Sequence, residues 1–335
     1  MRSRGHAVTQ SRGAAAQPRN RATAQPILIL TFLLLLAIAL AITFGAVTID
    51  LSDPTARMIL LRLRLPRVLL AAAIGATLAV AGVTFQTLLR NPLADPFILG
   101  VSGGAACGAA VATALRLNRI PGVVPAVAFA GALLATAAVF LLARRRDHTD
   151  PVRLLISGLV LNAFFSAVIL ISFALSPQSD LTAALKWMMG TLFGATWTSV
   201  LLVSTLLVVA MIVLAFVAND LRMLAFGEED AKARGVDVER IKLIGFGMAS
   251  IVTGAAVAVS GIIGFVGLLV PHLIRLVWRR DFRVLLPLCA IGGATLVVSA
   301  DLLSRIVVRS TELPIGAFTA ILGVPFFLSL LRKAP

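Results

Sequence analysis

An all-α membrane protein with about ten transmembrane helices is the fold that this sequence predicts. Hydrophobic residues make up 59% of its 335 residues, and the mean hydropathy of +1.00 is far above that of a soluble domain. Apolar runs of roughly 18 residues or more, each long enough to cross a bilayer, recur from Ile27 to Leu331. These runs are continuous and lack the alternation that a transmembrane β-barrel requires, which excludes that class.

The predicted spans follow one another with short connections. The first is too long for the core of a signal peptide. The seventh and eighth are separated by the break Gly261-Ile262-Ile263-Gly264, and one of them is expected to be short, because 241–279 barely holds two crossings. The ten spans are predicted at 27–47, 67–87, 97–115, 122–143, 153–175, 198–218, 241–260, 263–279, 284–303 and 314–331.

The positive-inside rule sets the expected orientation. Residues 1–26 contain five arginines and no acid, and they are predicted to form a disordered basic cytoplasmic tail before a single ten-helix transmembrane domain at 27–333. Ten spans return the C-terminus to the side of the N-terminus. Most of the 30 Lys and Arg residues then lie on the cytoplasmic side, in the tail and in the segments near 90, 144–153, 219–242, 275–283 and 332–333.

The formal net charge of +15 suggests nucleic-acid binding only at first sight. The basic residues occupy short loops between apolar runs and form no surface interleaved with aromatic residues, so no nucleic-acid partner is expected. Cys107 and Cys289 lie inside apolar segments, where a cysteine behaves as a small hydrophobic residue. Neither a disulfide nor a metal site is predicted.

A charged segment, residues 227–240, interrupts the apolar chain between two spans. Glu228, Glu229 and Asp230 open a short helix, where acids favour the positive end of the helix dipole. Gly235 then ends that helix in a sharp turn. This form suits docking to another protein better than it suits chemistry, although an ordinary solvated loop is the alternative.

Motifs for catalysis are missing from the sequence. It contains no GxxxxGK[ST] loop for ATP and no HExxH or Ser–His–Asp arrangement. Asp301 and His272 lie near predicted span ends, whereas ion-coupled carriers usually need acids or histidines inside the membrane. The chain is therefore expected to be neither an enzyme nor a carrier driven by protons.

Several arginines lie on the side that should be poor in positive charge. Arg62, Arg64 and Arg67 precede the second span, and Arg305 and Arg309 precede the tenth. Electrostatic docking of an acidic partner is one explanation. Contact with lipid headgroups or helix capping is the other.

Motifs throughout residues 57–333 resemble those of the permease subunits of bacterial ABC importers for iron chelates, haem and cobalamin. They occur in order and at the family spacing. They are Arg64-Leu65-Pro66-Arg67, Asn91-Pro92-Leu93-Ala94-Asp95-Pro96, Leu99-Gly100-Val101-Ser102, Gly264-Phe265-Val266-Gly267-Leu268-Leu269-Val270-Pro271-His272, Ala300-Asp301, Glu312-Leu313-Pro314-Ile315-Gly316 and Gly323-Val324-Pro325.

The resemblance implies a type II ABC importer fold and a homodimer in the bacterial inner membrane, with both termini in the cytoplasm. Two ATPase subunits would bind below and a periplasmic binding protein above, while ATP and magnesium would bind to the ATPases and no cofactor to this chain. The resemblance also assigns residues. It implies ATPase coupling by Glu228, Ala231, Arg234 and Gly235, binding-protein docking by Arg64, Arg67 and Arg305, and a path or gate formed by Asn91, Leu93, Asn162, Ser166, Thr149 and Asp150.

The gate differs from the family pattern at one place. The sequence there is His148-Thr149-Asp150-Pro151, where small hydroxyl residues are common in the family. The cargo is expected to be a bulky iron chelate, either a ferric siderophore or haem. A cobalamin permease is the alternative within the family, and an ion-coupled secondary transporter is the alternative from another class.

Overall fold

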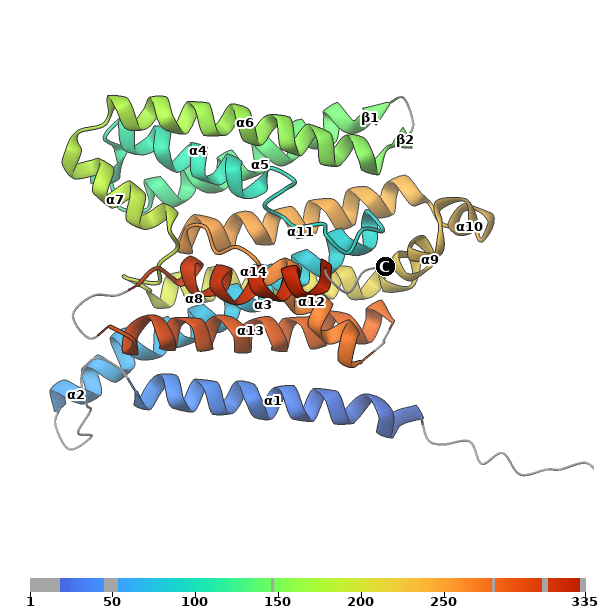
Figure 1. The fold of residues 1–335 in the computed structure, drawn as a ribbon, viewed down its shortest axis with the longest axis horizontal. Helices are drawn as coiled ribbons and strands as arrows, with labels where there is room; N and C mark the ends of the chain where they lie inside the picture. Colours follow the sequence, from blue (N-terminus) through green and yellow to red (C-terminus); the bar gives the residue numbers. More distant parts are fainter. Residues whose placement is uncertain (1–18, 45–53, 146–147, 279–280, 309–312, 332–335) are drawn as a thin grey trace, which may run out of the picture.

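The computed structural model describes residues 19–44, 54–145, 148–278, 281–308 and 313–331, which form a nearly all-helical bundle (Figure 1). The predicted fold class is confirmed. Two-residue strands, β1 (Arg144–Arg145) and β2 (His148–Thr149), pair antiparallel in the one hairpin of the described part. The helices are α1 (Arg19–Thr43), α2 (Pro54–Ile59), α3 (Leu65–Leu88), α4 (Val101–Ala114), α5 (Val123–Ala143), α6 (Pro151–Leu175), α7 (Gln178–Met188), α8 (Trp197–Phe216), α9 (Ala218–Phe226), α10 (Glu228–Ala233), α11 (Val238–Ser260), α12 (Val266–Val277), α13 (Phe282–Ile306) and α14 (Ile315–Leu331).

Each predicted span corresponds to a helix. Within the described residues, seven helical segments are long and apolar enough to cross a membrane, and α4, α12 and α14 are shorter apolar helices. The expected short span is α12, which follows the non-helical residues 261–264. The break is tightly packed, because a Cβ on Gly261 would lie 1.8 Å from the carbonyl oxygen of Trp187.

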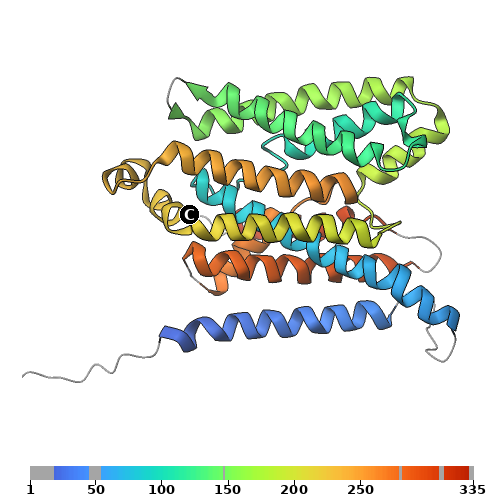
Figure 2. The ribbon, with the colours of Figure 1, turned by 180° about the vertical axis from the view of Figure 1, so that it is seen from behind.

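Most of the long helices run side by side along the bundle, and α3 crosses them obliquely (Figures 1 and 2). Helices α4, α5 and α6 form one side of the bundle and α1 the opposite side, with the other long helices between them. Helix α3 is buried along nearly its whole length. Its glycines allow backbones to approach closely: a Cβ on Gly75 would lie 2.1 Å from the oxygen of Gly293, and a Cβ on Gly82 would lie 2.0 Å from that of Gly267.

The two ends of the bundle carry different elements. Helices α9 and α10 lie with the β1–β2 hairpin at one end, here called the α10 end, and α2 and α7 lie at the other, the α7 end (Figure 1). Helix α1 begins and α14 ends toward the α10 end. This places the predicted docking segment and the predicted gate loop at one end of the molecule.

Some helix boundaries differ from those predicted. Helix α1 begins at Arg19, so residues 19–26 are helical and do not belong to a disordered tail. Alanine, arginine and glutamine favour helix, and they extend the apolar span toward the N-terminus. Residues 1–18 of the tail, residues 45–47 of the first span, and Arg309 and Glu312 lie outside the described residues. Helix α3 is preceded without interruption by α2 and a π-helical turn, Leu60–Arg64.

Candidate functional site

The charged segment folds as predicted, as a short helix followed by a glycine turn. Gly227 separates α9 from α10, and Gly235 has a φ of +81°, a left-handed conformation that glycine adopts without strain. Asp237 then caps α11 by accepting a hydrogen bond from the backbone N–H of Arg240. Helix α10 is thus held between two glycines.

The predicted coupling residues divide between two faces of this segment. Glu228 and Ala231 are three residues apart on α10, and both are buried against the bundle. Arg234 and Gly235 are exposed. The outward surface of α10 is formed instead by Glu229, Asp230, Lys232 and Ala233, next to Phe226, whose exposed fraction is 73%.

Glu228 faces inward because it pairs with Lys242. The ammonium nitrogen of Lys242 lies 2.8 Å from Oε2 of Glu228, 3.1 Å from Oε1 of Glu239 and 2.7 Å from the backbone oxygen of Thr149. The Lys242 side chain is only 4% exposed and that of Glu228 only 9%. A lysine ammonium has three N–H donors, and here each of them has an acceptor.

Further polar groups surround this pair. The hydroxyl of Thr149 donates to Oε2 of Glu239 at 2.6 Å, and Nδ1 of His148 lies 3.6 Å from Glu239 and 3.8 Å from Glu228. Nη2 of Arg90 lies 3.8 Å from Oε1 of Glu228. The six residues Arg90, His148, Thr149, Glu228, Glu239 and Lys242 are here called the Lys242 cluster.

The Lys242 cluster contains a set of groups that metal ions accept as ligands. The candidate ligand atoms of His148, Glu228 and Glu239 lie within 4.8 Å of one another. The ammonium of Lys242, however, contacts both carboxylates directly. We therefore interpret the cluster as an ion-pair network.

The predicted gate residues Thr149 and Asp150 connect the cluster to α6. Thr149 is fully buried and uses both its hydroxyl and its carbonyl oxygen within the cluster. Asp150 is the N-cap of α6, where its side chain accepts a hydrogen bond from the backbone N–H of Val152. Pro151 occupies the first turn of the helix, a position that suits proline.

The other predicted gate residues belong to the loop between α3 and α4, residues 89–100. Oδ1 of Asn91 accepts a hydrogen bond from the backbone N–H of Leu93, and Leu93 is exposed. The side-chain amide of Asn162 on α6 donates to the backbone oxygens of Phe97 at 2.9 Å and Ile98 at 3.3 Å. Asn162 therefore ties α6 to this loop.

Ser166 is the remaining predicted path residue, and Asp95 is an acid in the 89–100 loop. The hydroxyl of Ser166 donates to the carbonyl oxygen one turn earlier in its own helix. In the loop, burial raises the pKa of Asp95 to about 6, and the hydrogen bond from the backbone N–H of Phe97 lowers it by less. Asp95 thus titrates far above its ordinary value of 3.8.

The arginines of the α7 end are mostly buried in contacts within the chain. Nε of Arg67 lies 2.8 Å from Oδ1 of Asp301, and Nη2 of Arg305 lies 3.1 Å from Oδ2 of the same carboxylate. Arg64 donates to the backbone oxygens of Ile42 and Thr43 at the end of α1. Their role in docking a binding protein stays a prediction.

Two other ionisable side chains lie within the apolar helix α12. The guanidinium of Arg275 donates to Oε1 of Gln86, whose own amide donates to the backbone oxygen of Gly267. His272 lies edge-on to the rings of Phe326 and Phe327 on α14. These contacts join α12 to α3 and to α14.

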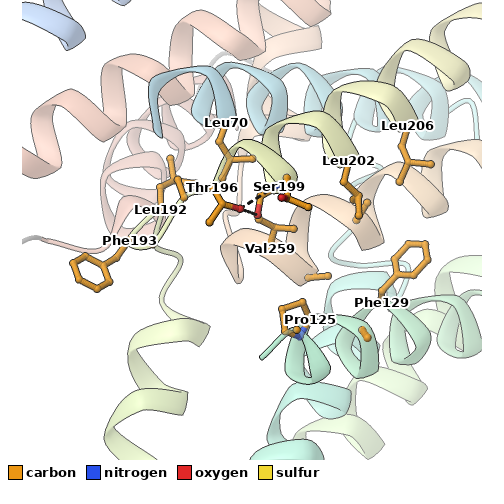
Figure 3. A pocket seen from close by; sticks show the side chains of 17 residues that line it. Leu70, Pro125, Phe129, Leu192, Phe193, Thr196, Ser199, Leu202, Leu206 and Val259 are labelled. Carbon is orange, nitrogen blue, oxygen red and sulfur yellow. Dashed lines mark hydrogen bonds between the residues drawn. The ribbon is translucent and has the colours of Figure 1, made fainter. Parts of the chain in front are cut away.

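A cavity of about 620 Å³ lies between α3, α5, α8 and α11 (Figure 3). Its labelled side chains are mainly apolar, among them Leu70, Phe129 and Leu202. Thr196 and Ser199 supply its polar edge, and their hydroxyls are 3.0 Å apart and bonded to each other. The residues that line it include no charged side chain.

Sequence reasoning missed the partners of these residues. It did not single out Lys242, although a lysine just inside an apolar span signals that an acid lies nearby. It also treated Asp301 and Arg305 separately, although their spacing of four residues places them on one helix face. The link from Asn162 to the 89–100 loop has no signal in the sequence.

Comparisons with known proteins agree with this architecture. The model of the FecCD transport family matches residues 27–333. The chain is 46% identical to the cobalamin import system permease protein BtuC of Halobacterium salinarum over 83% of this chain and 74% of that one. It is 39% identical to the hemin transport system permease protein HmuU of Yersinia pestis over 92% and 96%. The structure of a metal-chelate type ABC transporter in an inward-facing conformation superposes with a TM-score of 0.84 and 28% identity, over 93% of this chain and 100% of that chain.

Proposed function

The chain belongs to the FecCD transport family, and relatives of the chain are named as permeases of import systems. We propose that the chain passes a bulky iron chelate into the cytoplasm. The cargo would be a ferric siderophore or haem, delivered by a periplasmic binding protein. The chain itself is a permease subunit and not an ATPase. The relative named as a hemin permease and the metal-chelate type transporter support this cargo.

One observation carries the proposal. The outward face of α10 presents charged side chains next to the exposed Phe226 of α9, while its inner face is joined through Lys242 to the hairpin that precedes α6. A motor protein that moves α10 would therefore act on the loops at this end. ATP and magnesium would be bound by two ATPase subunits that dock on this surface, with Arg234 and Gly235 in the contact.

The remaining partners follow from the same arrangement. We place the α10 end in the cytoplasm and the α7 end on the periplasmic side of the bacterial inner membrane, in keeping with the distribution of positive charge. Helices α6 and α14 expose apolar side chains along their length, and a homodimer would bring these faces to a shared path. Arg64, Arg67 and Arg305 mark the region proposed to receive the binding protein.

An ion-coupled carrier is less well supported. Asp301 is a fully buried acid in a candidate span, but its carboxylate is paired with Arg67 and Arg305. Both oxygens of that carboxylate are thus engaged in contacts within the chain. Cobalamin is a second candidate cargo, and the Halobacterium relative named for it favours it.

Reconstitution tests the proposal. The chain would be co-expressed with ATPase and binding-protein subunits, purified and placed in proteoliposomes. We expect uptake of a radiolabelled iron chelate that requires ATP and is lost when the ATPase is omitted. Uptake of cobalamin but not of an iron chelate would show that cobalamin is the cargo. Uptake driven by a proton or sodium gradient without an ATPase would contradict the proposed mechanism.

A further inference from the structure

The side chain of Lys242 joins three segments of the chain. Lys242 belongs to α11, Glu228 is the first residue of α10, and Thr149 ends the β1–β2 hairpin, 93 positions before Lys242. Its ammonium bonds to Glu228 on α10, to Thr149 in the hairpin and to Glu239 on α11. One side chain therefore holds the docking helix and the hairpin in a common arrangement.

The ion pairs of the Lys242 cluster oppose a change in its geometry. The carboxylates of Glu228 and Glu239 are balanced by Lys242 and by Arg90, and each donor of the ammonium is satisfied. A buried ion pair contributes little net stability, but removing one partner leaves a buried charge uncompensated. Such a network favours one specific geometry over its alternatives.

Helix α10 has few other constraints at its ends. Gly227 and Gly235 flank it with φ values of +154° and +81°. A Cβ on Gly235 would meet no atom within 4 Å, so this turn lies in open space. The buried side chains of Glu228 and Ala231 hold the helix against the bundle. Ala231 can contribute only apolar contacts, whereas Glu228 also forms an ion pair with Lys242.

The other side of the cluster leads directly into α6. Thr149 is bonded twice, and the next residue, Asp150, caps α6. Further along α6, Asn162 holds the 89–100 loop through Phe97 and Ile98. A displacement of α10 would thus be transmitted through Lys242 to α6. From α6 it would be transmitted to the 89–100 loop.

We propose that Lys242 is a positioning residue that transmits movement of the docking helix α10 to the 148–150 gate segment and α6. This inference rests on the proposed function, since it requires a partner that moves α10. Lys242 touches neither cargo nor nucleotide in this scheme. It acts through Glu228 on one side and Thr149 on the other.

The first test measures cargo transported per ATP hydrolysed by the complete importer in proteoliposomes. Lys242→Met should lower this ratio by about tenfold, since coupling free energies between sites are commonly of that order. ATP hydrolysis and co-purification of the ATPase should persist, and Lys242→Arg should restore most of the ratio. Arg283→Met is the control, because Arg283 is an exposed cation on α13 that belongs neither to the charged segment 227–240 nor to the Lys242 cluster.

Two results of this test would overturn the inference. One is a wild-type ratio in Lys242→Met. The other is loss of ATPase co-purification in that variant, which would make Lys242 a determinant of docking. If Lys242→Met does not yield a folded complex, Thr149→Val removes the hydroxyl donor to Glu239 and should lower the ratio in the same direction; an unchanged ratio in Thr149→Val would overturn the inference as well.

A second measurement does not depend on the cargo. Arg153 lies near the start of α6, and its side chain is 48% exposed. In a chain with Cys107→Ser and Cys289→Ala, the maleimide reactivity of Arg153→Cys should change when ATP is added. Lys242→Met should abolish this change while ATP is still hydrolysed; persistence of the change would contradict the link. An ATP-dependent change without iron-chelate uptake would reject the cargo and leave the link in place, whereas no response to ATP in any assay would reject the proposed function.

Discussion

Nε of Arg67 lies 2.8 Å from Oδ1 of Asp301, although the two residues are 234 positions apart. The second oxygen of this carboxylate lies 3.1 Å from Nη2 of Arg305, one turn later in α13. Arg305 also donates to the backbone oxygen of Ala41 at 3.2 Å. The carboxylate thus joins α3 and α13, and Arg305 extends the connection to α1.

Neutralising this carboxylate should destabilise the protein. Asp301→Asn leaves the two guanidinium groups without their shared counter-charge, and breaking a buried pair costs about 3 kcal/mol. We expect a clear fall in the Tm measured in detergent. Asp281→Asn is the control, because Asp281 precedes the same helix and its side chain is 64% exposed; equal Tm values for the two variants would show that the Asp301 pairs contribute nothing.

Removing the amide of Asn162 should release the loop between α3 and α4. Asn162→Leu deletes both hydrogen bonds to the backbone oxygens of Phe97 and Ile98, each of which contributes about 0.5–1.5 kcal/mol. Hydrogen exchange in residues 91–100 should become faster. Ser166→Ala should leave it unchanged, since that hydroxyl bonds only within α6. Identical exchange in both variants would refute the anchoring role.

The close approach of α3 to α13 predicts that alanine substitutions at Gly75 and at Gly247 have opposite effects on stability. Gly75→Ala would place a Cβ 2.1 Å from the oxygen of Gly293, and the resulting displacement should cost about 2 kcal/mol. Gly247→Ala meets no atom within 4 Å on α11 and should stabilise the helix by up to about 1 kcal/mol. Thermal unfolding should therefore shift in opposite directions. A similar effect of both substitutions would contradict this helix contact.

The pKa of Asp95 predicts a pH dependence of the 89–100 loop. Its folded value of about 6 exceeds its ordinary value of 3.8, so the folded loop binds the proton more tightly. The stabilising contribution is complete below pH 3.8 and is lost as the pH rises through about 6. Asp95→Asn stays neutral and should gain stability relative to the wild type over this range. A difference in Tm that does not vary with pH would disprove the shift.

The glycine turn after α10 should be essential for docking. Gly235→Val forces a β-branched residue into the left-handed region at φ +81°, which costs at least about 1–2 kcal/mol and should distort the turn. We expect reduced co-purification of the ATPase. Ala130→Val introduces the same side chain at an exposed helical position of α5, outside the docking surface, and should retain binding. Full retention by Gly235→Val would argue against the proposed docking surface.

Much of the fold could be predicted because its signals are local. Each of the ten apolar runs contains a helix, and the glycines at 261–264 marked the break before the short α12. The acids of 228–230 and Gly235 marked a helix and its end. Each signal depends on neighbouring residues in the chain, where hydropathy and backbone preference act.

The partners of the charged residues could not be predicted in this way. Glu228 stays predicted for ATPase coupling and Asn162 for the path. The sequence did not predict that Glu228 pairs with Lys242 or that Asn162 bonds to the backbone of Phe97 and Ile98. Which side of a short helix is buried depends on the elements packed against it. Those elements come from other parts of the chain.

Apolar length and charge are properties of consecutive residues, so the sequence alone predicts a helical membrane protein with a charged segment at 227–240. The contacts by which Lys242 joins Glu228 to Thr149 and Asp301 joins Arg67 to Arg305 come from the tertiary structure alone. Buried charges must find partners wherever packing brings one within about 4 Å, and that proximity depends on how the helices pack together.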